Sequence, residues 1–200
     1  APMSAPPAAS AVPAVWADVI GKVLLSEERI AGRVAELGAQ ITADWRGEAA
    51  RREGEAPAPV LLGVLTGSYV FLADLSRRIE CGHEIRFIKA RSYEGDQSSG
   101  SVKITGIENY SLEGRDVIIV EDIVDTGLTM IALLEAVRNL GAASVRFCTL
   151  LHKNTARRVE GVPPADYVAF PIEDEFVVGY GLDFDQALRH LPFIGVYKKQ

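Results

Sequence analysis

Positive charge is in short supply in this sequence of 200 residues, which carries 21 Lys and Arg against 27 Asp and Glu, a formal net charge of −6. Proteins whose main partner is nucleic acid or an anionic membrane surface present a basic face. The acidic balance therefore argues against both partners. It also implies that a phosphate ligand, if the chain binds one, needs a divalent cation to offset the acids near it.

Cysteine is also scarce, and a long apolar run is missing. Cys81 and Cys148 lie far apart in the sequence, as expected of two reduced thiols in a cytoplasmic protein. No run of about 18 apolar residues is present, so we expect no membrane-spanning helix. The first residues contain no charged segment followed by an apolar one, so we expect no secretory signal either.

Two common nucleotide-binding motifs are absent. The pattern Gly-x-x-x-x-Gly-Lys-Ser/Thr does not occur, which excludes an ATP-binding P-loop. No Gly-x-Gly-x-x-Gly follows a strand-like segment, which excludes the dinucleotide-binding fingerprint. A nucleotide site in this chain must therefore have another form.

The domain organisation follows from composition. Ala, Pro, Ser and Val dominate the first residues and offer little to bury, so we expect residues 1–18 to form a flexible tail. Residues 19–200 are long enough to form a single domain with a sizeable core.

Apolar runs typical of buried strands alternate with amphipathic, helix-like segments along this domain. The expected strands lie at residues 60–65, 84–93, 102–107, 117–120, 144–151, 167–170 and 193–197. The first expected helix begins near Ser26 and carries an apolar stripe made by Ile30, Val34, Leu37, Ile41 and Trp45. Residues 46–59 are charged and contain Gly and Pro, so we expect a surface loop there. The order of elements predicts an α/β fold with a mostly parallel central sheet flanked by helices.

The most informative stretch is residues 117–129. Four apolar residues predict a buried strand, and three carboxylates and a Thr-Gly-Leu-Thr turn that opens a helix follow it. In parallel sheets such a turn places free N–H groups where phosphate groups bind. A turn of this kind is often only a structural connection. Glu121 and Asp122 favour a functional site, because acids beside an anion site are expected mainly where they contact a metal ion or sugar hydroxyls.

Three loops should meet at the same edge of the sheet, namely residues 65–68, 121–129 and 152–154. The polar segment at residues 94–101 contains no apolar residue to anchor it and is long enough to reach over them. We interpret it as a mobile lid, with an ordinary hairpin loop as the alternative.

Residues 120–129 resemble the phosphoribosyl-pyrophosphate motif of the type I phosphoribosyltransferases, and most closely that of the hypoxanthine-guanine phosphoribosyltransferases. Residues 61–69 are similar to the family's pyrophosphate loop, and residues 92–103 to its closing lid. Residues 150–155 and 176–184 are similar to its purine-recognising segments. Several motifs thus occur together in the family's order.

The resemblance, which extends over residues 24–197, implies the type I phosphoribosyltransferase fold, with a small hood formed by the N- and C-terminal segments. It implies a purine salvage enzyme that uses phosphoribosyl pyrophosphate and hypoxanthine or guanine, with xanthine as a further candidate. The products would be the nucleoside 5′-monophosphate and pyrophosphate. Mg²⁺ is the expected cofactor, and a homodimer or homotetramer is the expected assembly.

The resemblance also implies which residues bind the phosphoribosyl pyrophosphate. The phosphoribosyl part is expected to contact Glu121, Asp122, Asp125, Thr126, Gly127, Leu128 and Thr129. The pyrophosphate is expected at Leu65, Thr66, Gly67 and Arg189, with Ser92 and Tyr93 on the lid. The carboxylates expected near Mg²⁺ are those of Glu121, Asp122 and Asp183. For Arg189, a solvated surface position is the alternative.

At the purine end, Asp125 is the candidate general base for the proton on N7, with capping of the following helix as its alternative role. Lys153 would donate to the 6-oxo group and so select against adenine; its alternative is a solvated charge at a strand end. Phe176 would stack on the base, the Val177 backbone would read its edge, and Asp183 would lie nearby. For Phe176 and Val177 the alternative is an ordinary place in the core.

Two positions depart from the family pattern. Thr66 stands where many members carry a lysine, so pyrophosphate binding would depend more on Mg²⁺ and Arg189. Leu128 stands where some relatives carry a lysine, which leaves the phosphate turn with backbone N–H groups and hydroxyls. The family often has a cis peptide bond in the pyrophosphate loop, and we expect one between Leu65 and Thr66.

Two other hypotheses remain open at this point. A non-catalytic regulator on the same fold would sense phosphoribosyl pyrophosphate and bind nucleic acid, but it would need a basic face or a DNA-reading module. It would also have no use for Asp125 and Lys153 together. A phosphoribosyltransferase for a different base is the third hypothesis. Lys153 argues against adenine as that base, and residues 176–183 argue for a purine.

Overall fold

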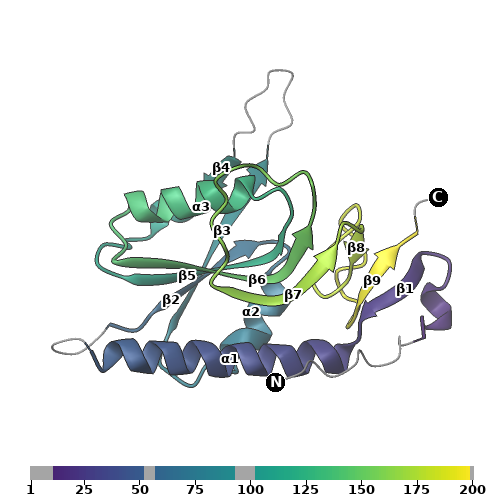
Figure 1. Cartoon of the computed structure of the whole chain (residues 1–200), viewed down its shortest axis with the longest axis horizontal. Helices are drawn as coiled ribbons and strands as arrows, with labels where there is room; N and C mark the ends of the chain where they lie inside the picture. The colour runs from purple at the N-terminus through teal and green to yellow at the C-terminus, as the bar shows by residue number, and fades with distance from the viewer. Residues whose placement is uncertain (1–10, 52–56, 93–101, 199–200) are drawn as a thin grey trace, which may run out of the picture.

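The structure is a computed structural model that describes residues 11–51, 57–92 and 102–198 (Figure 1). The strands of its main sheet are β2 (Val60–Leu65), β3 (Glu84–Ser92), β4 (Val102–Thr105), β5 (Asp116–Val124), β6 (Ser144–Asn154) and β7 (Tyr167–Glu173). They lie in the order β4-β3-β2-β5-β6-β7. β3 and β4 pair antiparallel, and all the other neighbours pair parallel. The expected mostly parallel α/β sheet is confirmed.

Helices cover both faces of this sheet (Figure 1). α1 (Glu27–Ala49) and α2 (Tyr69–Ser76) pack on one face, and α3 (Leu128–Asn139) packs on the other. Leu61 and Ile118 point into the first layer, whereas Leu62 and Ile119 point into the second. The central strands are therefore apolar at every position because both of their faces are buried. Over residues 11–51, 57–92 and 102–198, no helix is long and apolar enough to cross a membrane.

α1 begins where its cap predicts. The Ser26 hydroxyl accepts a hydrogen bond from the Arg29 amide at 3.3 Å. The residues of its expected apolar stripe are buried, namely Ile30, Val34, Leu37, Ile41 and Trp45. The helix continues to Ala49, so the loop expected from residue 46 begins too early. Its last turn is polar but anchored, since Arg46 donates to the Glu80 carbonyl and Glu48 pairs with Arg146.

The N- and C-terminal segments form the expected hood. β1 (Ile20–Leu25), β9 (Ile194–Tyr197) and β8 (Val177–Val178) make an antiparallel sheet in the order β1-β9-β8. Val12 and Trp16 pack against its apolar core, and the Trp16 ring lies 5.4 Å from that of His190. Residues 1–10 of the expected tail lie outside the described residues. Val12 and Trp16 belong to the remainder of that segment, and the boundary of the expected tail at residue 18 stays a prediction.

The segment expected as a lid joins β3 to β4. Ser92 pairs with Val102 across this antiparallel pair, so the expected return strand is confirmed. Tyr93 and the polar segment that follows it lie outside the described residues.

Candidate active site

Two acids, Glu121 and Asp122, lie near the carboxyl end of β5. Burial raises the pKa of Glu121 well above its ordinary value, and the charge of Asp122 adds to the rise. Burial also raises the pKa of Asp122 to about 6, although the Ile123 amide donates to its Oδ1 at 2.9 Å. Glu121 Oε2 is buried and has no hydrogen-bond partner among the described residues. Glu121 Oε2 thus has room for a donor, which a sugar hydroxyl or a hydrated cation would supply.

The turn after β5 opens α3, as the sequence predicts. Gly127 has a φ of +90°, and a Cβ there would lie 2.4 Å from Val162 Cγ2. Glycine is therefore required both by the backbone conformation and by the space. The Thr126 carbonyl accepts from the Val159 amide at 3.0 Å, which ties the turn to the loop after β6. The turn presents the first amides of α3, the groups that bind anions at helix N-termini.

The loop between β2 and α2 has the expected cis peptide bond, from Leu65 to Thr66. The next residue, Gly67, packs against the acid pair, since a Cβ on Gly67 would lie 1.5 Å from Asp122 Oδ2. A Cβ on Gly181 would lie 2.1 Å from the Gly67 carbonyl oxygen. The backbone of this loop is therefore held directly between the β5 acids and the hood.

Arg189 of the hood borders the same space. Its Nη2 lies 2.8 Å from Asp183 Oδ1, and its Nη1 donates to the Gly181 carbonyl at 2.7 Å. Only 17% of the Arg189 side chain is exposed, so the alternative of a solvated surface arginine is wrong. The Arg189 charge lowers the pKa of Asp122 against the larger effect of burial. Arg189, Asp183 and Asp122 therefore act on one another electrostatically.

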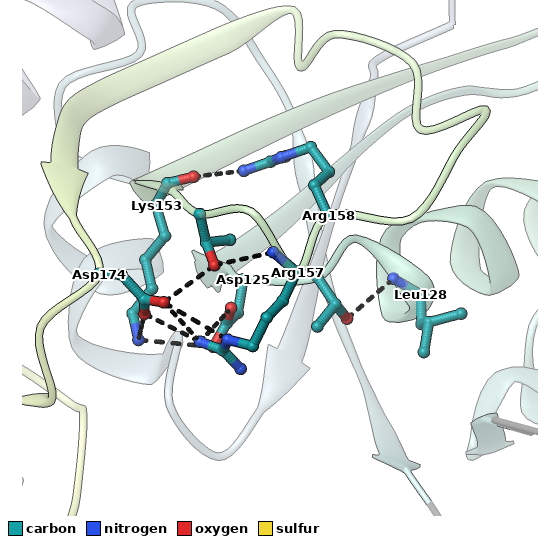
Figure 2. Close-up of polar contacts among 8 residues, drawn as sticks. Asp125, Leu128, Lys153, Arg157, Arg158 and Asp174 are labelled. Carbon is teal, nitrogen blue, oxygen red and sulfur yellow. Dashed lines mark hydrogen bonds and ion pairs between the residues drawn. The ribbon is translucent and has the colours of Figure 1, made fainter.

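Lys153 and Asp125 face each other at the carboxyl end of the sheet (Figure 2). Lys153 Nζ lies 3.4 Å from Asp125 Oδ2. Lys153 is 7% exposed, so the alternative of a solvated charge is wrong. Gly127 is the N-cap residue of α3, so the alternative of Asp125 as the helix cap is also wrong.

Two further residues, missed by the reasoning from sequence, complete this group of charges. Arg157 Nη2 lies 3.0 Å from Asp125 Oδ1 and 2.8 Å from Asp174 Oδ1. Lys153 Nζ lies 3.3 Å from Asp174 Oδ1, and the Thr155 hydroxyl donates to Asp174 Oδ2 at 2.9 Å. The hydrogen bonds from Arg157 and Thr155 are the main reason that the pKa of Asp174 falls to about 2. No local pattern identifies these residues, because they meet only through the fold.

Phe176 follows Asp174 by two residues and directly precedes β8. It is 42% exposed, so it is not a core residue. Its ring meets those of Phe184 and Tyr197 edge-on, with centroids 6.0 and 5.9 Å away, and those two rings stack at 4.3 Å. Val177 is buried and pairs with Val196 in the hood sheet. Phe176 is therefore held by two aromatic rings while part of its surface remains open.

The predicted residues thus form two neighbouring groups, one around Asp122 and one around Asp125. Ser92 is placed only by its backbone in β3, and Tyr93 lies outside the described residues. Within the described part of the chain, no three Asp, Glu, His or Cys side chains are grouped so as to hold a metal ion. Glu121, Asp122 and Asp183 therefore do not form a metal site by themselves, and a cation there would need ligands from substrate or water.

Known proteins resemble this chain over most of its length. Residues 24–185 match the family described as "Phosphoribosyl transferase domain". The chain is 43% identical to the hypoxanthine-guanine phosphoribosyltransferase of Bacillus subtilis, covering 90% of this chain and 94% of that protein. It is 42% identical to the bifunctional protein TilS/HprT of Listeria innocua, of which it spans about a quarter, 26%.

Solved structures agree with the sequence relatives. A hypoxanthine phosphoribosyltransferase from Staphylococcus aureus has a TM-score of 0.81 and 38% identity, covering 94% of this chain and 97% of that one. A point mutant of the hypoxanthine phosphoribosyltransferase from Trypanosoma cruzi, solved with the product IMP, has a TM-score of 0.80 and 38% identity, covering 90% of this chain and 91% of that one.

Proposed function

The chain belongs to the hypoxanthine-guanine phosphoribosyltransferases within the phosphoribosyl transferase domain family, and from this premise we propose that it catalyses purine salvage. Hypoxanthine or guanine reacts with phosphoribosyl pyrophosphate and gives the nucleoside 5′-monophosphate and pyrophosphate. Xanthine is a further candidate base. The charge balance of the chain, −6, supports neither nucleic acid nor a membrane as a partner.

One observation carries this proposal: the buried Lys153 ammonium lies 3.4 Å from the carboxylate of Asp125, which directly precedes the turn that opens α3. Lys153 donates to the 6-oxo group, which adenine lacks. Asp125 accepts the proton from N7. Phe176 stacks on the base, and the Val177 backbone reads its edge. The N-terminus of α3 would bind the 5′-phosphate of the nucleotide.

The bonds follow from this arrangement. N9 of the base forms a bond to C1′ of the ribose as the bond from C1′ to the pyrophosphate oxygen breaks. The pyrophosphate leaves with that electron pair, and the N7 proton passes to Asp125. General-base assistance of this kind contributes a rate factor of about 10²–10⁴.

The phosphoribosyl group is held mainly by backbone and by the acid pair. Residues 126–129 bind the 5′-phosphate through amides and the hydroxyls of Thr126 and Thr129, with Leu128 contributing only its backbone. Glu121 and Asp122 bond the ribose hydroxyls. Leu128 is exposed and carries no charge into this turn.

The pyrophosphate lies between Leu65, Thr66, Gly67 and Arg189. Thr66 offers a hydroxyl where many relatives have an ammonium, so Arg189 supplies the side-chain cation. Ser92 and Tyr93 belong to a segment that would close over this end of the site.

The acids fit a Mg²⁺ cofactor held through the substrate. Glu121 Oε2 has no hydrogen-bond partner among the described residues, and burial raises the pKa of both Glu121 and Asp122, so a cation beside them would favour their ionised forms. Both acids and Asp183 would reach the ion through water. Mg²⁺ bound to the pyrophosphate would neutralise the charge that develops on the leaving group.

Two broader features also belong to this proposal. Cys81 and Cys148 are both free thiols, as expected in the reducing cytoplasm. A homodimer or homotetramer is the expected assembly.

The deciding experiment compares hypoxanthine, guanine, xanthine and adenine as substrates with phosphoribosyl pyrophosphate and Mg²⁺. We expect pyrophosphate release with at least one 6-oxopurine, none with adenine, and loss of turnover after chelation of the metal. Absence of turnover with all four bases would contradict the proposed enzyme. Turnover with adenine alone would contradict the role of Lys153.

A further inference from the structure

Lys153 and Arg157 both contact the carboxylates of Asp125 and Asp174, and Asp174 accepts more hydrogen bonds than Asp125 does (Figure 2). Asp174 accepts from Arg157 through both Nε at 3.4 Å and Nη2 at 2.8 Å, and it also accepts from Thr155. Asp125 meets Arg157 through Nη2 alone: its Oδ2 accepts from that nitrogen at 3.1 Å, while its Oδ1 lies 3.0 Å away and has no hydrogen-bond partner among the described residues. Asp174 is therefore the better satisfied of the two acids.

The two cations also differ in their freedom to move. Lys153 lies within β6, and only 9% of its side chain is exposed, so packing fixes it. Arg157 lies on the loop after β6, and 55% of its side chain is exposed. A long side chain with this exposure can change rotamer without disturbing the core. Arg157 is thus the member of the group that can leave Asp125.

Arg157 and a purine would compete for the same atoms. The carboxylate oxygens of Asp125 that face Arg157 and Lys153 are those that must receive the N7 proton of the base. Arg157 Nη2 donates to Oδ2 at 3.1 Å and lies 3.0 Å from Oδ1, so it stands against both oxygens of the Asp125 carboxylate. Binding of the base therefore requires Arg157 to withdraw, and Asp174 is the acid to which it is already bonded.

We propose that Arg157 caps Asp125 only while the base site is empty, and that Asp174 is a positioning residue that holds Arg157 and Lys153 when a 6-oxopurine displaces the cap. This inference rests on the proposed function. Without Asp174, Arg157 and Lys153 would both turn to Asp125. Arg157 would then block the proton acceptor, and Lys153 would move away from the 6-oxo group. Asp174 thus acts through Arg157 and Lys153 and does not itself touch the reacting atoms.

The test compares four proteins: wild type, Asp174→Asn, Arg157→Met and the double variant. Since a hydrogen bond to a charged group contributes about 1.5–3 kcal/mol, Asp174→Asn is expected to raise the KM for hypoxanthine about tenfold or more. Arg157→Met removes the cap and is expected to lower that KM by about threefold. The double variant should return to within about threefold of wild type, because the surplus cation is gone. The KM for phosphoribosyl pyrophosphate should stay unchanged throughout.

The KM of the double variant for hypoxanthine shows whether Asp174 positions the two cations or only stabilises the loop. If Asp174 only stabilised the loop, removing Arg157 as well would leave the KM for hypoxanthine as high as in Asp174→Asn or higher. That result, or a raised KM in Arg157→Met, would overturn the proposal. Matched controls are Glu173→Gln, an exposed acid next to Asp174, and Arg138→Met, an exposed arginine on α3; neither should change either KM.

A structural measurement keeps this inference separate from the proposed function. Wild-type turnover tests the function alone, whereas crystal structures of the ligand-free wild type and of its hypoxanthine complex need no turnover. We expect Arg157 on both acids without the base, and on Asp174 only with it. An Arg157 that stays on Asp125 beside bound hypoxanthine, or that never contacts Asp125, would overturn the inference. Should Asp174→Asn not fold, Asp174→Glu and Arg157→Met still provide the comparison of KM values.

Discussion

Asp125 differs from the other carboxylates of the site in what surrounds it. Glu121 and Asp122 stand beside each other with few donors, whereas Asp125 faces Lys153 and Arg157. Asparagine has the same shape as aspartate but cannot accept the proton as a base, so Asp125→Asn should leave the neighbouring turn in place and remove only the proton acceptor. Asp125 is for this reason the residue at which chemistry and binding can be separated.

Asp125→Asn is expected to lower kcat by about 10²–10⁴. The KM for phosphoribosyl pyrophosphate should change little, because the neighbouring turn is proposed to bind the phosphate mainly through backbone amides. Steady-state kinetics with both substrates measure the two effects. The matched control is Asp18→Asn, an exposed acid near the N-terminus, which should behave as wild type. An unchanged kcat in Asp125→Asn would leave Asp125 with no catalytic role.

Asp174 should make the stability of the folded protein depend on pH in the acidic range. Its pKa in the folded protein is about 2, below the ordinary value of 3.8, because Arg157 and Thr155 donate to its carboxylate. A depressed pKa contributes stability above the ordinary value, and that contribution is lost as the pH falls toward 2. The difference in denaturation midpoint between wild type and Asp174→Asn should therefore be constant from about pH 5 to 7, because the carboxylate is ionised in the folded and the unfolded protein throughout that range. It should shrink below about pH 4. A difference that persists undiminished at pH 3 would show that the ion pair is not its cause.

At the scale of elements, the junction between β5 and α3 depends on one glycine. In Gly127→Ala the new Cβ would meet Val162 at 2.4 Å and the residue would keep a φ of +90°. We expect a loss of about 1–3 kcal/mol in the free energy of unfolding. The KM for phosphoribosyl pyrophosphate should rise as the turn shifts. Chemical denaturation and kinetics on the same protein measure both.

Gly32→Ala is the matched control for this substitution. Gly32 lies on the exposed side of α1, with no atom within 4 Å of a Cβ placed there. Alanine is a better helix former, so this variant should gain up to about 1 kcal/mol. Equal losses of stability in the two variants would mean that the packing of Gly127 against Val162 does not matter.

The elements were also the most predictable part of the molecule. Residues such as Leu61, Leu62, Ile118 and Ile119 follow each other without polar interruption, a pattern typical of strands buried on both faces. The last turn of α1 could not be predicted in the same way. It is polar and gains its partners, Glu80 and Arg146, from segments far along the chain.

For the whole molecule, the family resemblance predicted the cis peptide bond between Leu65 and Thr66, which is present. The parallel sheet predicted that the loops at residues 121–129 and 152–154 would meet, and Lys153 lies 3.4 Å from Asp125. The roles of these residues remain predictions. Arg157 and Asp174 could not be found in this way, since a charged residue on a loop looks the same in sequence whether or not the fold gives it a partner. The packing of Val12 and Trp16 on the hood was missed for the same reason.

The proposed purine end of the site lies where the chain passes from the central sheet to the hood sheet. β7 ends at Glu173 and β8 begins at Val177, so residues 174–176 alone join the two sheets here (Figure 1). Asp174 stands on one side of this crossing and Phe176 on the other, while the phosphate turn belongs to the central sheet. Val177 and Ile194 of the hood belong to the same buried cluster as Leu61 and Ile118 of the central sheet, so the core that joins the two sheets also fixes the spacing between Asp174 and Phe176.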